Sequence, residues 1–310
     1  MVLHNYFKDL NISESSKTTY NYSIKRLKKL AKSDDLKIIN QPDEVVKLIS
    51  EIVIKSRQIM YTSLVNYLKC HDPSNLKLIE IYQAKSSITQ NTITAKLKEQ
   101  KMDIVKTESM VDTKDLKKVA KSIMTEIKLS KEGSKNHYKL CQYHLIVNLY
   151  LKIGCRLDLG EMSIVSSKQY NDLNDEQQRE TNYLIISPKK KYLFQFNAFK
   201  NVKSIGPVQF KPDRYLVGLL NKWFKINKSK YLLTKLDKVG KLGRSGLGRI
   251  LRVIFKVYLG KTKSSVNAIR HGRITESCKG QKSIKKLEVE ASKWFHNNST
   301  HQMYRNIDDN

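Results

Sequence analysis

Six side chains suited to chemistry on a phosphate group are spread over the second half of this 310-residue sequence. They are two arginines, a lysine, an asparagine, a histidine and a tyrosine. A guanidinium can donate two parallel hydrogen bonds to phosphate oxygens, an ammonium can act as a general acid, and a phenol can act as a nucleophile. In chain order, these residues are Arg156, Lys200, Asn267, Arg270, His296 and Tyr304.

Each of these residues also has an ordinary structural interpretation. The first arginine could cap the helix that precedes it, and the lysine could be a solvated residue of a basic turn. Arg270 and Arg273 could share one solvated helix face. The histidine could pack beside Trp294, and the tyrosine could anchor the end of the chain to the core. The order and spacing of the whole set, rather than any single residue, favour a common site.

This order resembles that of the tyrosine recombinase, or phage-integrase-like, family. IGCRLDLGEM is similar to the family's first arginine motif, and NAFKNVKSIG is similar to the hairpin that holds its lysine. SVNAIRHGRIT resembles the H-x-x-R-H box, and FHNNSTHQMY resembles the closing His and Tyr box. The resemblance covers most of the chain and is strongest from 150 to 305. Within the family, these motifs are most similar in character to those of integrases of large DNA viruses, virophages and related mobile elements.

The sequence departs from the family pattern at three places. Asn267 occupies the position where the H-x-x-R box usually begins with His. Leu159 occupies the position of a usual carboxylate, and Asp158 and Glu161 lie on either side of it. The segment RNIDDN after Tyr304 is short, so we expect the assembly contact that a longer tail makes to be absent or made otherwise.

The resemblance implies that two arginines bind the phosphate that reacts. A phosphodiester gains negative charge on its non-bridging oxygens as a nucleophile attacks, and fixed guanidiniums stabilise that charge. Arg156 and Arg270 are the candidates for this role. Asn267 and His296 would add hydrogen bonds to the same oxygens.

The resemblance also implies a nucleophile and a general acid. Tyr304 would attack the phosphate and form a 3′-phosphotyrosine bond, which stores the energy of the broken strand and allows rejoining without ATP. The 5′ oxygen leaves as an alkoxide and needs a proton. Lys200, with Lys203 as the alternative, would supply that proton.

We expect no metal and no cofactor at this site. The sequence has no acidic cluster of the kind that a two-metal nuclease uses. Cys141 and His144 have a ligand-like spacing, but no second pair accompanies them. The widely spaced cysteines instead indicate free thiols in a reducing compartment; they are Cys70, Cys141, Cys155 and Cys278.

The charge predicts a nucleic-acid partner. Lys and Arg total 58 against 29 Asp and Glu, and the formal net charge is +29. Such an excess attracts polyanions, and the expected partner is double-stranded DNA. The resemblance implies a homotetramer on two DNA sites. No apolar run approaches the ~20 residues of a membrane span, and no signal peptide is evident. We therefore expect no membrane partner and an intracellular protein at DNA, in a host nucleus, a cytoplasmic viral factory or a nucleoid.

The patterns predict a mainly α fold with a small antiparallel sheet, in two domains. Residues 1–110 would form a helical, DNA-binding (core-binding) domain, and residues 111–310 the catalytic domain, with a polar linker near 107–115. In the first domain we expect a helix capped at Ser13, Ser15 or Ser16, a second near Val45 to Ile52, a third from Ile59 to the HDPSN turn at 71–75, and a fourth over 92–106. In the second we expect helices from Leu116 to Ile127 and from Leu140 to Ile153, strands at 183–187, 190–199 and 206–210, and helices at 212–225, 245–258, 264–278 and 283–296.

The leading hypothesis is a site-specific DNA recombinase or integrase. A type IB topoisomerase would use the same groups as a monomer on nearly any sequence, but the size of the chain and the short span from Arg156 to Tyr304 favour the recombinase. A decayed recombinase that only binds DNA is supported by Asn267 alone. A plain basic nucleic-acid-binding module would be indifferent to replacement of Tyr304.

Overall fold

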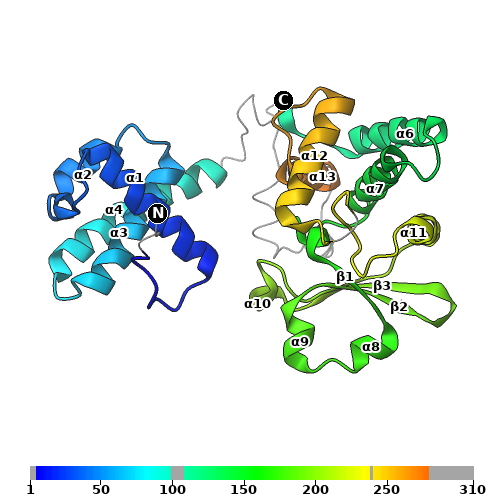
Figure 1. Cartoon of the computed structure of the whole chain (residues 1–310). Coiled ribbons are helices and arrows are strands. Elements are labelled where there is room, and N and C mark those ends of the chain that lie inside the picture. The colour runs from blue at the N-terminus through cyan, green and yellow to red at the C-terminus, as the bar shows by residue number, and fades with distance from the viewer. Residues whose placement is uncertain (1–4, 99–107, 238–239, 279–310) are drawn as a thin grey trace. The chain divides into compact units, whose positions relative to one another are not determined.

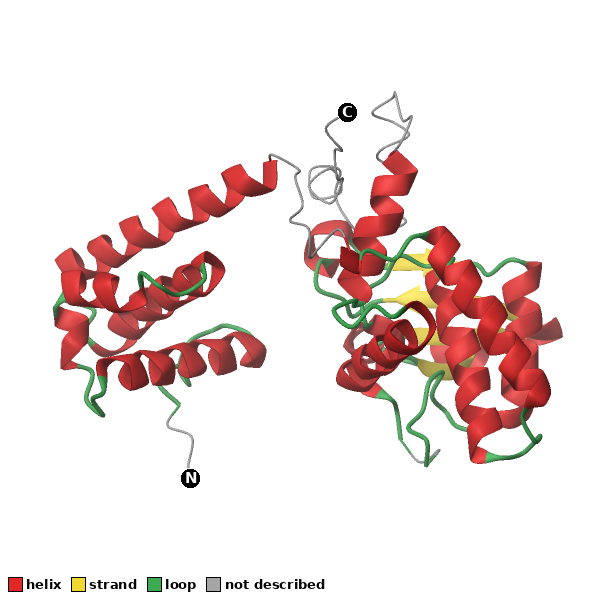
Figure 2. Ribbon diagram, turned by 90° about the horizontal axis from the view of Figure 1, so that it is seen from above, coloured by secondary structure: helices red, strands yellow, loops and turns green. Residues whose placement is uncertain are grey.

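The described fold is mainly α-helical with one small β-sheet, as the sequence predicts (Figure 1). The computed structural model describes residues 5–98, 108–237 and 240–278. The chain divides into two compact units, Met1–Glu99 and Gln100–Asn310. This division lies ahead of the boundary at 110 that the sequence suggests. All the described strands belong to the second unit, as Figure 2 shows.

The described part of the first unit consists of helices. Ser13 caps the first of them by accepting a hydrogen bond from the amide of Ser16 at 3.2 Å, which is one of the predicted caps. Ile24 and Leu27, from the predicted apolar face, are fully buried. The α-helices are α1 (Glu14–Ala31), α2 (Pro42–Ile49), α3 (Ile54–His71) and α4 (Leu76–Lys98), with a 3₁₀ turn at Lys37–Asn40.

The start of α4 differs from the prediction. The HDPSN turn ends α3 as expected, but the side chain of Asn75 then accepts a hydrogen bond from the amide of Leu78 at 3.3 Å and begins a new helix at once. The prediction that this helix begins near 92 is therefore wrong. The polar residues around the buried Leu78, Ile79 and Tyr82 hide the helical period in the sequence. The end of the predicted helix, 99–106, lies outside the described residues.

The long helices of the second unit occur where the sequence predicts them. They are α6 (Thr113–Leu129), α7 (Lys135–Tyr150), α11 (Arg214–Ile226), α12 (Gly243–Leu259) and α13 (Val266–Cys278). Shorter helices are α8 (Ser167–Asn171), α9 (Asp175–Glu180) and α10 (Val202–Ile205), with 3₁₀ turns at Asp158–Glu161 and Pro188–Lys190. The helix predicted over 283–296 lies outside the described residues.

The sheet is mixed, which corrects the prediction of an antiparallel one. Its order is β1 (Ser163–Ser166), β2 (Tyr183–Ser187), β3 (Lys191–Phe196) and β4 (Val208–Phe210). β2, β3 and β4 pair antiparallel, but β1 pairs parallel to β2, with Ser163 opposite Tyr183. Parallel neighbours need a long crossover, which α8 and α9 supply. The four residues of β1 are too few for an alternating pattern to show in the sequence.

The core of the second unit is built around α7. Leu145, Ile146, Val147 and Leu149 are all buried, so the C-terminal half of the helix is buried on every side. Figure 1 shows α6, α7, α12 and α13 on one side of the sheet and α8 and α9 on the other. The buried α7 therefore gives a fixed starting point to the loop that follows Tyr150.

Candidate active site

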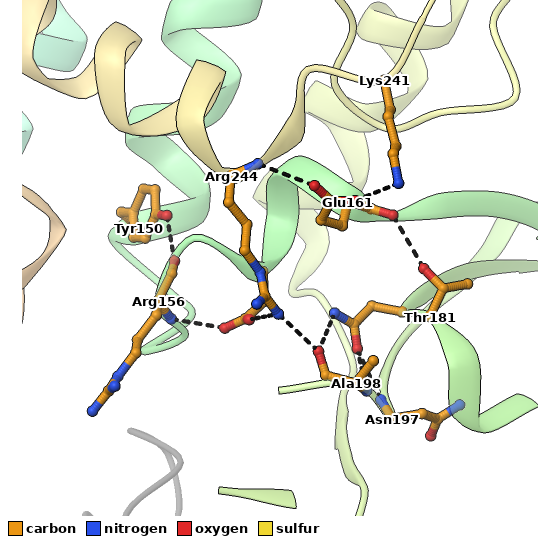
Figure 3. Close-up of polar contacts among 10 residues, drawn as sticks. Tyr150, Arg156, Glu161, Thr181, Asn197, Ala198, Lys241 and Arg244 are labelled. Atoms are coloured by element: carbon orange, nitrogen blue, oxygen red, sulfur yellow. Dashed lines mark hydrogen bonds and ion pairs between the residues drawn. The ribbon is translucent and has the colours of Figure 1, made fainter. Parts of the chain in front are cut away.

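The loop after α7 holds Arg156 by its backbone. The hydroxyl of Tyr150 donates a hydrogen bond to the carbonyl oxygen of Arg156 at 2.5 Å. The amide of Arg156 donates to Oδ2 of Asp158 at 3.1 Å. The side chain itself is half-buried and extends away from Arg244 in Figure 3. The main chain is thus fixed, and the guanidinium remains available at the surface of the unit.

Arg270 is a buried arginine, with 1% of its surface exposed. Its Nη1 donates a hydrogen bond to the carbonyl oxygen of Gly154, two residues before Arg156. On the same helix, Nη1 of Arg273 donates to the carbonyl oxygen of Tyr150 at 2.6 Å. The interpretation of Arg270 as a solvated surface residue is therefore wrong. α13 brings its guanidinium to the loop that holds Arg156.

The segment with Lys200 begins where β3 ends. The carboxamide oxygen of the buried Asn182 accepts hydrogen bonds from the amides of Asn197 and Ala198, both at 2.9 Å. The side-chain nitrogen of Asn182 donates to the carbonyl oxygen of Ala198 at 3.1 Å. Lys200 follows as an exposed residue, and Lys203 is exposed on α10. The loop base is fixed, and both candidate general acids face solvent.

An ion pair joins the Arg156 loop to α12. Nη2 of Arg244 lies 2.9 Å from Oδ1 of Asp158 and also donates to the carbonyl oxygen of Ala198 at 3.3 Å (Figure 3). Asp158 is buried, so burial raises the pKa of its carboxyl, while the charge of Arg244 and the amide of Arg156 oppose that rise. A buried carboxylate of this kind needs its partners in order to remain charged.

A second carboxylate anchors the start of α12. Oε1 of Glu161 accepts a hydrogen bond from the amide of Arg244 at 3.2 Å, and Oε2 lies 2.5 Å from Nζ of Lys241. Burial acts against ionisation, but the hydrogen bonds and charges of Lys241 and Arg244 hold the pKa of Glu161 below its ordinary value. The two acids beside Leu159 therefore both bind the segment that begins α12.

The other predicted site residues divide into two groups. Asn267 is exposed and lies one helical turn before Arg270 on α13. His296 and Tyr304 lie outside the described residues. The structure thus brings together the loops of Arg156 and Lys200 and the helix of Asn267 and Arg270, and the roles of all six residues stay predictions.

Sequence reasoning missed Arg244 and Asn182, although both hold predicted site segments. Arg244 lies in KLGRSGLGR, with no motif around it and 86 positions from Asp158. Asn182 precedes β2 as an ordinary polar residue. The one available signal was Asp158, which appears in the sequence only as a displaced carboxylate.

The Cys141 and His144 pair lies elsewhere, in an apolar cavity of about 260 Å³ between α6, α7 and α11 that Trp223 also lines. Burial, with a smaller contribution from Lys222, lowers the pKa of His144 to about 4. Within the described residues, no group of three His, Cys, Asp or Glu side chains could hold a metal ion. Over the same residues, no helix is both long and apolar enough to span a membrane.

No model of a known protein family matches this chain, and no curated protein matches it. Among solved structures, the chain is similar to that of XerA recombinase, at 12% identity over 96% of this chain and 90% of the other, with a TM-score of 0.42. The case for a function therefore rests on the geometry of the site.

Proposed function

We propose that this protein is a DNA strand-exchange enzyme that cleaves and rejoins DNA through a covalent phosphotyrosine, as a site-specific recombinase or integrase does. In this proposal four protomers act on two DNA sites of a viral or other mobile element. No metal, cofactor or ATP takes part in the reaction. The first unit holds the DNA backbone, and the second performs the chemistry.

The buried Arg270 is the observation that best supports this proposal. Burying an arginine costs free energy unless its N–H groups are hydrogen-bonded and its positive charge is compensated. The guanidinium of Arg270 lies against Gly154, close enough to Asp158 for the two charges to interact. Arg156 is two residues from Gly154 in the same loop. The guanidinium of Arg270 thus lies at the loop that holds Arg156, more than a hundred residues away in the sequence, which supports the proposal that the two arginines bind one phosphate.

The proposed reaction balances without a co-reactant. The phenol oxygen of Tyr304 bonds to phosphorus and gives up its proton to solvent, while the bond from phosphorus to the 5′ oxygen breaks. The ammonium of Lys200 gives a proton to the leaving 5′ oxygen. Arg156, Arg270 and Asn267, with His296, stabilise the charge on the non-bridging oxygens. Rejoining reverses these steps with a 5′ hydroxyl as the nucleophile.

Covalent trapping tests the proposal directly. Wild type and Tyr304→Phe are incubated without metal with nicked duplexes drawn from the ends of the element that encodes the gene. We expect wild type to form an adduct joined to a DNA 3′ end on a denaturing gel, and Tyr304→Phe to bind the duplex equally well but form no adduct. The phenyl ring keeps the shape of the side chain and lacks the nucleophilic oxygen.

Three results would contradict the proposal. Tight binding without any adduct from wild type would indicate a protein that binds DNA only, with Asn267 as the first residue to examine. An adduct that survives in Tyr304→Phe would place the nucleophile elsewhere. Relaxation of supercoiled plasmid by a monomer, on unrelated sequences, would instead favour a topoisomerase.

A further inference from the structure

We infer that Arg244 is a positioning residue that holds the Lys200 loop in register with the Arg156 loop. The inference rests on the proposed function, because it assigns Arg244 a task within that site. Arg244 would act through Asp158 and Ala198 and would not itself react. Its loss should impair departure of the 5′ oxygen more than binding of the phosphate.

One nitrogen of Arg244 links the two loops. Nη2 lies 2.9 Å from Oδ1 of Asp158, whose other oxygen accepts the amide of Arg156. The same nitrogen donates to the carbonyl oxygen of Ala198 at 3.3 Å, two residues before Lys200. A continuous chain of hydrogen bonds therefore runs from the main chain of Arg156 to the base of the Lys200 loop (Figure 3).

The backbone of Arg244 is itself fixed, so its side chain has a defined origin. Its amide donates to Oε1 of Glu161 at 3.2 Å. Gly243 has a φ of +76°, the left-handed conformation that glycine adopts without strain. A Cβ on Gly160 would lie 2.5 Å from the carbonyl oxygen of Gly243, so these two backbones approach as closely as glycine allows. The start of α12 is thus fixed against the 3₁₀ turn at Asp158–Glu161.

The two partners of this ion pair differ in burial, so Asp158 depends on the contact more than Arg244 does. The side chain of Asp158 is 6% exposed and that of Arg244 is 52% exposed. The buried carboxylate depends on its hydrogen bonds to stay charged, whereas the guanidinium gains less from the contact. A neutral residue at 244 would leave Asp158 buried with one partner fewer and would remove one of the two side-chain hydrogen bonds to the carbonyl of Ala198.

The consequence falls on Lys200, because Arg244 binds its loop at Ala198, two residues earlier. Asn182 still holds the main chain of residues 197 and 198 from the other side. The buried Phe199 comes next and then the exposed Lys200, so the position of Lys200 depends on where Ala198 and Phe199 are held. A displacement of about 1 Å of a reacting group can cost roughly 100-fold in rate.

A substrate whose leaving group needs no proton distinguishes positioning of the general acid from binding of the phosphate. In a duplex whose scissile 5′ oxygen is replaced by sulfur, the leaving thiol has a pKa of about 8.5 and departs without a general acid. Single-turnover adduct formation is measured with oxygen and sulfur substrates for wild type and variants. We expect Arg244→Gln and Lys200→Ala to be roughly 10-fold to 100-fold slow with oxygen and close to wild type with sulfur. Arg156→Ala should stay slow with both.

Two comparisons sharpen the kinetic test. Arg179→Gln is the matched control, because Arg179 pairs with Asp175 at 3.7 Å on α9 and both side chains are exposed. It should match wild type with both substrates. Arg244→Gln, Asp158→Asn and the double variant form a cycle in which the two losses should be less than additive. Equal slowing of Arg244→Gln with oxygen and sulfur would overturn the inference and make Arg244 a phosphate ligand.

Hydrogen exchange provides a readout that does not depend on activity. The amides of residues 197–201 should exchange faster in Arg244→Gln than in wild type, while Arg179→Gln should leave them unchanged. Unchanged exchange in Arg244→Gln would overturn the inference whether or not the enzyme is active. Faster exchange with no adduct from wild type would instead support the link and refute the proposed reaction.

Discussion

At the scale of single residues, burial separates side chains that look alike in the sequence. Arg270 is 1% exposed, whereas Arg252 on α12 faces solvent. Asp158 is buried with two partners, although the sequence shows it only as one of two acidic residues near Leu159. A charge removed from water must be paired, so each buried charge identifies a contact that the fold maintains.

His144 gives a prediction about pH. Its pKa is lowered to about 4 in the folded protein, against an ordinary value near 6.5 for an exposed imidazole. The unfolded chain therefore binds a proton first, and stability should fall as the pH drops from about 6.5 toward 4. At pH 5 this effect should amount to about 2 kcal/mol in the free energy of unfolding.

Chemical denaturation at pH 7 and pH 5 checks this expectation. His144→Gln lacks the titrating group, so its free energy of unfolding should fall less than that of wild type between the two pH values. Glu132 and His137 line the same cavity and are present in both proteins, so any contribution they make cancels in the difference. Equal losses in wild type and variant would show that His144 is not held neutral.

At the scale of elements, α13 is held by hydrogen bonds to two other segments. Its Arg270 donates to Gly154 in the loop after α7, and its Arg273 donates to Tyr150, the last residue of α7. A hydrogen bond from the amide of Val111 to the carbonyl oxygen of Ala268 ties the helix to the segment before α6. Part of the predicted polar linker, 107–115, thus packs on α13 within the second unit. Close packing of this helix is what presents Arg270 to the loop.

Gly272 tests that packing. A Cβ at this position would lie 2.5 Å from the carbonyl oxygen of Val111, which is backbone and cannot move aside. We expect Gly272→Ala to lower the free energy of unfolding by about 1–3 kcal/mol and to reduce adduct formation by displacing Arg270.

Gly218→Ala is the matched control. Gly218 lies inside α11 with open space where the methyl group of alanine would lie, so this substitution should stabilise the protein by roughly 0.5–1 kcal/mol. Urea denaturation measures both variants. Opposite signs are expected, and a neutral or stabilising Gly272→Ala would contradict the close approach of α13 to the segment before α6.

At the scale of the whole molecule, the dominant property is charge. Most of the net charge of +29 lies in the second unit, with +23 in residues 100–310 and +6 in residues 1–99. In the first unit, the exposed face of α1 presents Lys25, Arg26 and Lys29. Positive side chains that meet DNA phosphates release condensed counterions, so binding weakens linearly on a logarithmic salt scale. Under the proposed function, the basic face of α1 supplies part of this attraction.

The salt dependence of duplex binding tests this role. We expect the variant Lys25→Gln with Lys29→Gln to bind less tightly and to have a shallower slope, by about 1 for each phosphate that is no longer neutralised. Arg179→Gln removes an exposed charge from α9 and should leave the slope as in wild type. An unchanged slope in the double variant would move the DNA backbone contacts away from α1.

The sequence by itself determined the helical class, most helix positions, the mixture of residue types at the site and the attraction to polyanions. These follow from local periodicity, from caps such as Ser13 and from net charge, none of which needs long-range contacts. Only the tertiary structure decided that Arg270 is buried, that β1 runs parallel to β2, and that Arg244 joins Asp158 to Ala198. Burial and pairing between distant segments depend on how elements pack, and no local pattern encodes the partner of a side chain 86 positions away.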